Sequence, residues 1–122
     1  MNHLNSIILE GNIASDPQLK ETNSGGSVCT FKLASDRYFK KNNQVEKEVS
    51  FIEIQTWGKL AEIVGDFGNK GRGVRVTGRI KQDKWEGPEG EPRSKIIIVA
   101  ENVELRKENK KEEPVEKNDG VA

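Results

Sequence analysis

A single change of hydrophobic period, at Trp57, constrains the fold of this chain more than any other feature. Before it, residues 48–57 alternate between apolar and polar side chains, with the period of two that is typical of a β-strand. After it, apolar residues recur with the spacing of one face of a short helix: Leu60, Ile63, Val64 and Phe67. We therefore predict one amphipathic helix directly after a strand, with its apolar stripe packed on the core.

Four further segments are predicted strands: residues 4–13, 28–34, 74–80 and 96–105. Turn signals at Asp16-Pro17 and at residues 23–26 separate the first two. Residues 35–47 are a long polar connection, and Asn42-Asn43 is the expected tip of a hairpin there. Cys29 shares its strand face with apolar residues, so we expect it in the core as a small apolar side chain.

The order of these elements is three strands, one helix and two strands. A five-stranded antiparallel sheet with one helix between the third and fourth strands is the pattern of the OB-fold, an all-β class. That fold is a small Greek-key barrel whose outer face binds oligonucleotides or oligosaccharides. A β-sandwich or an SH3-like barrel is the structural alternative, but neither requires the helix.

The composition allows one domain and excludes several classes of protein. In the 122-residue chain we expect the domain over residues 1–105 and a disordered charged tail over residues 106–122, which has too few apolar residues to offset the entropy of ordering. No segment has the length of a transmembrane helix, and the first six residues lack the pattern of a secretory signal. One cysteine suits a reducing cytoplasm.

The same inventory argues against an enzyme. The chain has one cysteine and one histidine, so a metal site is not expected. It offers no plausible nucleophile–base pair and no Gly-rich phosphate loop after a strand, so we predict no catalytic residue and no cofactor.

Exposed aromatic residues are the chain's most informative functional feature. Phe51 and Trp57 fall on the strand face that carries Glu53 and Gln55, opposite the isoleucines of the same strand. Trp85 lies in a polar stretch, residues 84–92, that is a loop or a hairpin end. The structural alternative is that these rings pack under neighbouring loops. In the connection 35–47, Tyr38 and Phe39 stand side by side, and they either fold back on the body or serve as a platform.

Rings interleaved with cations are what single-stranded nucleic acid requires, because bases stack on rings and phosphates need positive charge. The candidate stacking residues are Phe39, Phe51, Trp57 and Trp85, with the choice between Tyr38 and Phe39 left open. The candidate backbone contacts are Lys40, Lys41, Lys59, Lys70, Arg79, Lys81 and Lys84. In the strand 74–80 the whole outer row is expected to be cationic, from Arg75 through Arg79 to Lys81.

At these residues the chain resembles the bacterial single-stranded DNA-binding protein family, over about residues 4–105. The matching segments are Leu9-Glu10-Gly11-Asn12, Asp16-Pro17, residues 31–35, residues 57–62, Lys70-Gly71, residues 76–79 and Lys84-Trp85. The resemblance implies an OB-fold homotetramer that binds single-stranded DNA in replication, recombination and repair, in the cytoplasm at the nucleoid. It also implies that Phe39, Phe51, Trp57 and Trp85 stack on bases.

The homotetramer has one physical indication in the residues. The strand 4–13 is apolar on both faces, with Ile8 opposite Ile7 and Leu9, and the start of the strand 96–105 is similar. Either another subunit covers the outer face, or the strand is a central one in the barrel.

Two departures from the family pattern qualify the resemblance. Asp83 stands where a basic residue is common before the tryptophan. The family's acidic, Pro-Phe-terminated tip, which recruits replication and repair proteins, is absent, since the sequence ends at Asp119-Gly120-Val121-Ala122. The chain is therefore either truncated or works with a paralogue that carries the tip, and recruitment of partners by that route is in doubt.

Two other binding functions remain open at the level of the sequence. One is an OB-fold protein-interaction module of a replication-restart complex, and the other is an RNA-binding OB domain. No residue clearly reads a 2′-hydroxyl, so the preference for DNA over RNA rests on the resemblance.

Overall fold

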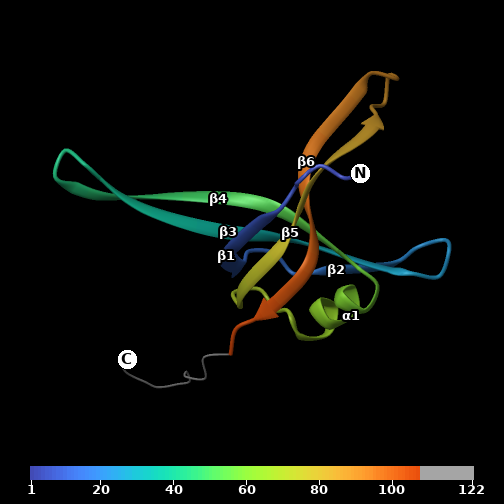
Figure 1. The fold of residues 1–122 in the computed structure, drawn as a ribbon, viewed down its shortest axis with the longest axis horizontal. Coiled ribbons are helices and arrows are strands. Elements are labelled where there is room, and N and C mark those ends of the chain that lie inside the picture. Colours follow the sequence, from blue (N-terminus) through green and yellow to red (C-terminus); the bar gives the residue numbers. More distant parts are fainter. Residues whose placement is uncertain (108–122) are drawn as a thin grey trace.

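A barrel closed by five strands forms the body of the molecule (Figure 1). The computed structural model describes residues 1–107 of the 122-residue chain. The elements are β1 (Ile7–Ile13), β2 (Gln18–Glu21), β3 (Ser27–Lys41), β4 (Gln44–Trp57), α1 (Gly58–Phe67), β5 (Gly73–Glu86) and β6 (Pro92–Leu105). The sheet order is β1-β5-β6-β4-β3-β2, and an additional pairing of β1 with β3 closes the barrel.

One strand pairing is parallel, so the prediction of a wholly antiparallel sheet is wrong. β4 runs parallel to β6, with Ile54 opposite Ile98 and Gln55 opposite Val99, whereas the other pairs are antiparallel. The parallel pair arises because β6 returns along β5 to the far side of the barrel, where β4 lies. Alternation along a strand indicates which side chains face the core, but it carries no information on the direction in which the neighbouring strand runs.

Residues 35–47 are not the polar connection that the sequence suggested. β3 and β4 stay paired from Ser35↔Ser50 out to Lys41↔Gln44, and this two-stranded extension, residues 35–50, is called the β3–β4 arm below. Asn42 and Asn43 have φ angles of 52° and 63°, which suits the tight turn of a two-residue hairpin, so the predicted tip is confirmed. The arm projects from the barrel rather than folding back on it (Figure 1).

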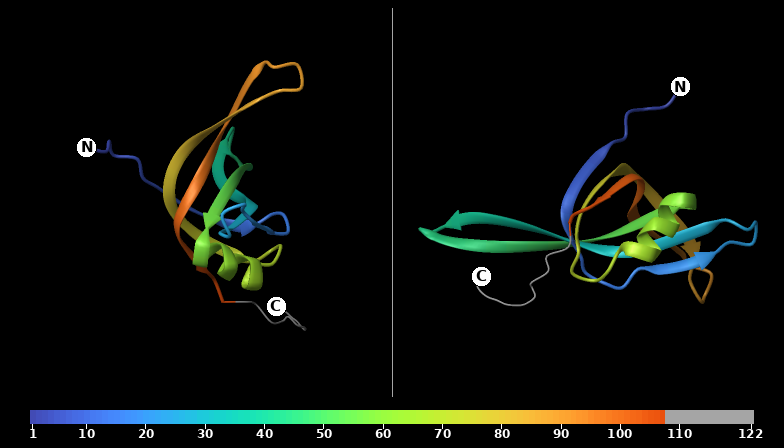
Figure 2. Two further views of the ribbon diagram at one scale, coloured as in Figure 1. Left: turned by 90° about the vertical axis from the view of Figure 1, so that its right-hand side faces the viewer. Right: turned by 90° about the horizontal axis from the view of Figure 1, so that it is seen from below.

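β5 and β6 also extend past the barrel, as the β5–β6 hairpin, residues 80–98. Trp85 lies in β5 opposite Arg93, close to the end of this hairpin, as expected from its polar neighbourhood. The arm and the hairpin leave the barrel in different directions, and α1 lies across one end of it (Figure 2). The short strand β2 was not predicted, because all four of its residues are exposed and leave no apolar pattern.

The core is built from the inward-facing residues of the strands and from α1. Cys29, Phe31 and Leu33 of β3 are buried together, so the prediction for Cys29 is confirmed. Thr56 is the buried polar residue of this core, and its hydroxyl donates a 2.9 Å hydrogen bond to the Cys29 carbonyl oxygen. The buried hydroxyl therefore has a hydrogen-bond partner within the core.

The helix starts where glycine allows the chain to change direction. Gly58 has a φ of 64°, in the left-handed region that favours glycine, directly after the extended Trp57. Ala61 and Val64 are the buried residues of α1, and Leu60 packs partly on the core. Ile63 and Phe67 are 38% and 59% exposed, so the prediction that the whole apolar stripe is core packing is wrong. The stripe is wider than the end of the barrel that α1 covers.

At the carboxyl end, β6 ends at Leu105, and the Arg106 amide still donates a 2.9 Å hydrogen bond to the Gly73 carbonyl. The predicted disordered tail lies, from residue 108 onward, outside the described residues, and the domain boundary stays a prediction. Within residues 1–107, no helix has the length and apolar character needed to cross a membrane.

Candidate nucleic-acid interface

The outward side of β4 carries the two aromatic residues that the alternation placed there. Phe51 and Trp57 are 64% and 47% exposed, whereas Ile54 and Thr56 on the opposite face are buried. The Trp57 indole N–H donates a 2.8 Å hydrogen bond to Oε1 of Gln55 on the same face. This bond restrains the orientation of the indole while leaving much of the ring accessible.

The neighbouring strands extend this side into a continuous surface. Paired residues of adjacent strands project to the same side of a sheet. Val99 of β6 is paired with Gln55 of β4 and with Arg79 of β5, so one surface crosses three strands. We call it the outer face; its residues are Phe51, Glu53, Gln55 and Trp57 of β4, Arg93, Lys95, Ile97 and Val99 of β6, and Arg79, Lys81, Asp83 and Trp85 of β5.

The outer face has an apolar floor between longer side chains. Ile97 and Val99 are 0% and 6% exposed, although they are not members of the core cluster inside the barrel. Arg79 and Lys81 are their partners in β5 and are exposed. Two of the predicted backbone-contact residues therefore lie on the same surface as the rings of Phe51 and Trp57.

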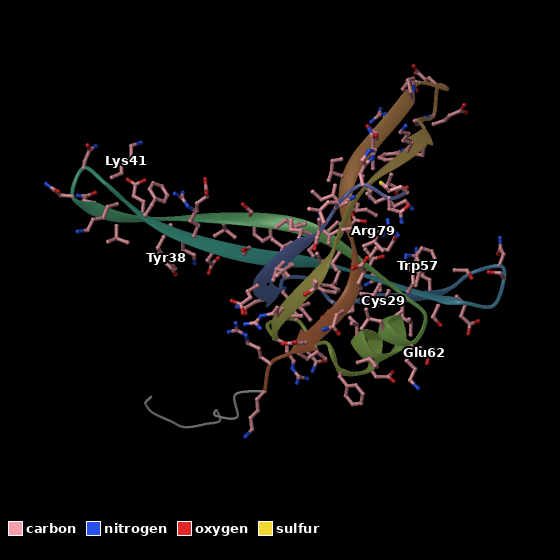
Figure 3. The ribbon with its side chains drawn as sticks, in the orientation of Figure 1. Cys29, Tyr38, Lys41, Trp57, Glu62 and Arg79 are labelled. Atoms are coloured by element: carbon pink, nitrogen blue, oxygen red, sulfur yellow. The ribbon has the colours of Figure 1, made fainter. Side chains whose placement is uncertain are left out.

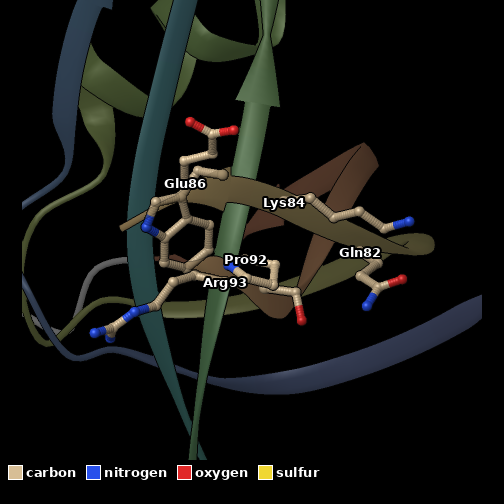
Figure 4. A pocket seen from close by; sticks show the side chains of 7 residues that line it. Gln82, Lys84, Glu86, Pro92 and Arg93 are labelled. Carbon is tan, nitrogen blue, oxygen red and sulfur yellow. The ribbon is translucent and has the colours of Figure 1, made fainter. Parts of the chain in front are cut away.

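Trp85 stands at the far end of this surface, beside a hollow in the β5–β6 hairpin (Figure 4). The indole is 45% exposed, so it is not packed under a loop. The hollow has a volume of ≈ 470 Å³ and is lined by Gln82, Lys84, Trp85, Glu86, Pro92, Arg93 and Ser94. Lys84, a predicted backbone contact, thus lies beside Trp85 rather than on the outer face itself.

The two aromatic residues of the β3–β4 arm point to opposite sides. Phe39 is half-buried and lies 5.1 Å below the Arg37 guanidinium, measured from ring centroid to Cζ. Tyr38 is 64% exposed and, by the alternation along β3, lies on the side of Ala34, the partner of Phe51. Figure 3 shows Tyr38 and Lys41 well out along the arm, where Lys40 also lies. The structure therefore brings Tyr38, not Phe39, to the side of Phe51.

Two other predicted cations lie elsewhere. Lys59 is exposed in the first turn of α1, two residues after Trp57. Lys70 lies in the turn before β5 and lines a separate hollow of ≈ 370 Å³ together with Arg72, Arg106 and Lys107. The structure does not place Lys70 on the outer face.

The outer row of the strand 74–80 is not uniformly cationic, which corrects the sequence-based expectation. Arg75 lies 2.6 Å from Oε2 of Glu10 and 3.8 Å from Oε1 of Glu104, so its charge is balanced within the barrel wall. Hydrogen bonds from Arg75 and then Arg106 hold the pKa of the Glu10 carboxyl below its ordinary value. Only Arg79 and Lys81 of that row remain for a ligand on the outer face.

Lys95 lies on the outer face, although no sequence pattern predicted it as a site residue. Lys95 is opposite Asp83 in the hairpin, and its Nζ lies 5.7 Å from the centroid of the Trp85 ring. No sequence signal separates it from other surface lysines, because only the register of β5 on β6 puts it beside Trp85.

Chemistry at Cys29 is disfavoured, because burial raises the pKa of its thiol. No cluster of metal-ligating residues occurs among residues 1–107.

A closed five-stranded Greek-key barrel with one helix across its end is an OB-fold. Its exposed rings, cations and apolar floor are the features of an oligonucleotide-binding face. Residues 4–106 match the model of the single-strand binding protein family, and the chain belongs to that family.

Curated relatives agree with this assignment. A protein of Treponema pallidum, named single-stranded DNA-binding protein, is 38% identical over 86% of this chain, which spans 59% of the length of that relative. A Clostridium acetobutylicum protein, named single-stranded DNA-binding protein 2, is 40% identical over 84% of this chain and 76% of its own length.

Solved structures show the same fold. The Plasmodium falciparum SSB in complex with ssDNA superposes with a TM-score of 0.79 at 24% identity, over 88% of this chain and 98% of that chain. A deletion mutant of the single-stranded DNA binding protein from Thermus aquaticus superposes with a TM-score of 0.76 at 26% identity, over 87% of this chain and 52% of that chain.

Proposed function

We propose that this chain binds and protects single-stranded DNA without reading its sequence, during replication, recombination and repair. The observation that carries the proposal is the placement of Phe51, Trp57 and Trp85, all exposed, on one face that crosses β4, β6 and β5. As a member of a family of binding proteins, the chain is a binder and not an enzyme.

The rings supply the larger and sequence-tolerant part of the affinity. Every base has a π-face, and stacking on an aromatic side chain contributes about 1–3 kcal/mol for each base. Phe51, Trp57 and Trp85 are each about half exposed or more, so their faces are available. Phe39, on the other side of the arm, is the fourth proposed stacking residue and requires the strand to wrap around the arm.

The cations supply a salt-dependent part. Arg79 and Lys81 flank the apolar floor, and Lys84 lies beside Trp85. Lys40 and Lys41 on the arm and Lys59 after Trp57 extend the positive charge along the proposed path of the single-stranded DNA. Lys70 belongs to this path only if the DNA continues past α1 to the turn before β5. Each phosphate contact releases counterions, so affinity falls as salt rises.

We also propose that the protein works as a homotetramer at the bacterial nucleoid, in the cytoplasm where chromosomal single strands arise. Ile8 is 67% exposed on the outside of β1. It lines a hollow of ≈ 670 Å³ with Leu9, Glu10, Ser35, Asp36, Arg75, Thr77 and Glu104. A second copy that covers Ile8 removes this apolar surface from water.

Tryptophan fluorescence tests the DNA-binding proposal directly, because the chain has two tryptophans and both are proposed stacking residues. Titration with oligo-dT is expected to quench the emission to saturation, with a midpoint that moves to higher DNA concentration in high salt. Trp57→Ala and Trp85→Ala each remove part of the quenching. Unchanged emission at DNA concentrations well above micromolar would contradict the proposal and favour a protein-interaction module.

A further inference from the structure

β4 and β6 separate immediately beyond their short parallel pairing, and an ion pair joins them at that point. The two strands pair only at Ile54↔Ile98 and Gln55↔Val99, and beyond these residues the arm and the hairpin diverge (Figure 1). At the divergence the Lys95 Nζ lies 3.0 Å from Oε1 and 3.2 Å from Oε2 of Glu53. We call this place the fork, and its residues are Glu53, Lys95 and Asp83.

The charge of the fork is unusual for a surface that meets phosphates. Lys95 is held between both carboxylate oxygens of Glu53, and its cross-strand partner is a second acid, Asp83. Two acids against one base leave the fork with a net negative charge. The remaining outward cations of β5, Arg79 and Lys81, lie nearer the barrel.

Glu53 is also the least exposed acid among the ion pairs of residues 1–107. Its side chain is 22% exposed, compared with 39% for Glu91 and 43% for Glu10 in their pairs. A phosphate that captured Lys95 would have to displace this carboxylate and then lie close to it. Like charges at short range with restricted access to water repel each other strongly, so that exchange is unfavourable.

Lys95 has a second contact that does not involve phosphate. Its Nζ lies 5.7 Å from the centroid of the Trp85 ring, within the range of a cation–π interaction. The ion pair therefore holds a positive charge at the indole and leaves the rest of the ring to stack on a base. Lys95 is thus a positioning residue for Trp85.

From these contacts we propose that Glu53 withholds Lys95 from the DNA backbone. The fork is then a place where a bound single strand presents bases, to Phe51 and Trp85, while its phosphates lie toward Arg79, Lys81 and the arm lysines. This inference rests on the proposed binding of single-stranded DNA. It names Glu53 as a residue that sets the orientation and the salt dependence of that binding.

The test is the slope of log Kd against log salt for oligo-dT, measured on the full chain by tryptophan fluorescence. Glu53→Gln keeps the shape of the side chain and frees Lys95, so it is expected to tighten binding about two- to fivefold at low salt. It also adds one phosphate contact and so steepens the slope by about 0.7. Glu53→Thr, which suits a strand, is expected to do the same.

Lys95→Gln distinguishes a Lys95 that Glu53 holds away from the DNA from a Lys95 that already contacts a phosphate. In the native background it is expected to weaken binding, because Trp85 loses its cation, without changing the slope. In the Glu53→Gln background the same substitution returns the steepened slope to the native value. The matched control is Glu62→Gln on α1, whose carboxylate is contacted by the Ser27 hydroxyl; it removes an equal charge and leaves the slope unchanged.

Three results would overturn the inference. If both Glu53 variants have the same slope of log Kd against log salt as the native chain, Glu53 does not withhold Lys95 from the DNA. Normal binding of oligo-dT by the native chain would still support the proposed function in that case. A slope that flattens by about 0.7 in Lys95→Gln alone shows that Lys95 already contacts a phosphate. Absence of any binding by the native chain removes the proposed function and the inference together.

Discussion

The side-chain amide of Asn5 pairs with the backbone of Ile80 in β5 as a further strand residue would. Its Nδ2 donates to the Ile80 carbonyl oxygen at 2.8 Å, and its Oδ1 accepts from the Ile80 N–H at 2.9 Å. The regular pairing of β1 with β5 ends at Ile7↔Gly78, so this amide continues the ladder at the base of the β5–β6 hairpin.

Asn5→Ala is expected to destabilise the fold by about 1–2 kcal/mol, because both backbone groups of Ile80 lose their partner. Urea unfolding followed by circular dichroism measures the change. Asn5→Asp keeps the acceptor for the Ile80 N–H but loses the donor to the Ile80 carbonyl oxygen. Its free energy of unfolding should therefore lie between those of the native chain and Asn5→Ala, or match Asn5→Ala if the carboxylate repels that carbonyl. A midpoint unchanged in Asn5→Ala would show that the two hydrogen bonds contribute no net stability.

The Glu10 cluster predicts sensitivity to acid. Hydrogen bonds from Arg75 and Arg106 lower the pKa of Glu10 in the folded chain below the ordinary 4.5. Its contribution to stability is therefore present above pH 4.5 and is lost as the pH falls through the lowered value. The native chain should exceed Glu10→Gln in stability at pH 7, and the difference should shrink as the pH falls through the lowered pKa of Glu10.

Urea midpoints at several pH values check this prediction, with Glu62→Gln as the control for loss of one negative charge on the surface. A difference between the native chain and Glu10→Gln that is the same at pH 7 and pH 2 would contradict an ionic origin.

The seam where the barrel closes tolerates no side chain at Gly11. A Cβ there would collide with the carbonyl oxygen of Ala34, because β1 and β3 approach closely at Asn12↔Ala34. Gly11→Ala is expected to cost about 1–3 kcal/mol, since the backbone must shift. In the control, Gly26→Ala, the nearest atom is the Thr22 hydroxyl oxygen at 3.3 Å, on a side chain that can move. Equal thermal midpoints for the two variants would argue against a tight seam.

Phe51 is expected to carry more affinity for single strands than any other β4 side chain except Trp57. Phe51→Ala should weaken binding to oligo-dT by about 1–3 kcal/mol through the loss of one stacked base. Val45→Ala, on the same strand near the arm's end, removes exposed apolar surface without removing a ring and should have little effect. Fluorescence titration compares them, and similar losses in both would exclude stacking as the role of Phe51.

Ile8 predicts the oligomeric state. An aspartate there places a charge where a second copy is proposed to cover an apolar side chain that is 67% exposed in one chain. Ile8→Asp is expected to lower the mass measured by light scattering while circular dichroism stays native. Thr77→Ser, at the partner position in β5, serves as a mild control. If the mass of Ile8→Asp is unchanged, the proposal that a second copy covers Ile8 is contradicted.

Much of the fold was predictable because most elements of the barrel have a local signal. The switch at Trp57 from a period of two to a helical period marks α1, which follows at Gly58. Phe51 and Trp57 lie outside because alternation puts them opposite Ile54 and Thr56, which are buried. These inferences needed only the geometry of a strand, in which neighbouring side chains point to opposite faces.

The failures arise where tertiary contacts, and not the local pattern, decide the outcome. The polar residues 35–47 became strands because β3 and β4 hydrogen-bond through their backbones and form the ion pairs Arg37–Glu48 and Asp36–Lys47, which need no apolar pattern. Phe67 stayed exposed because the end of the barrel accommodates only part of the apolar stripe of α1.

The sequence by itself determined the helix, the strands of the barrel wall, the core residues of β3 and the rings that face solvent, since these follow from local periodicity. Only the tertiary structure decided which rings and charges meet. The neutralisation of Arg75 by Glu10, and the position of Lys95 between Glu53 and Trp85, depend on strand register and on the parallel pairing of β4 with β6. Register joins residues far apart in the chain, so the periodicity of one strand does not reveal which residue of another strand lies opposite.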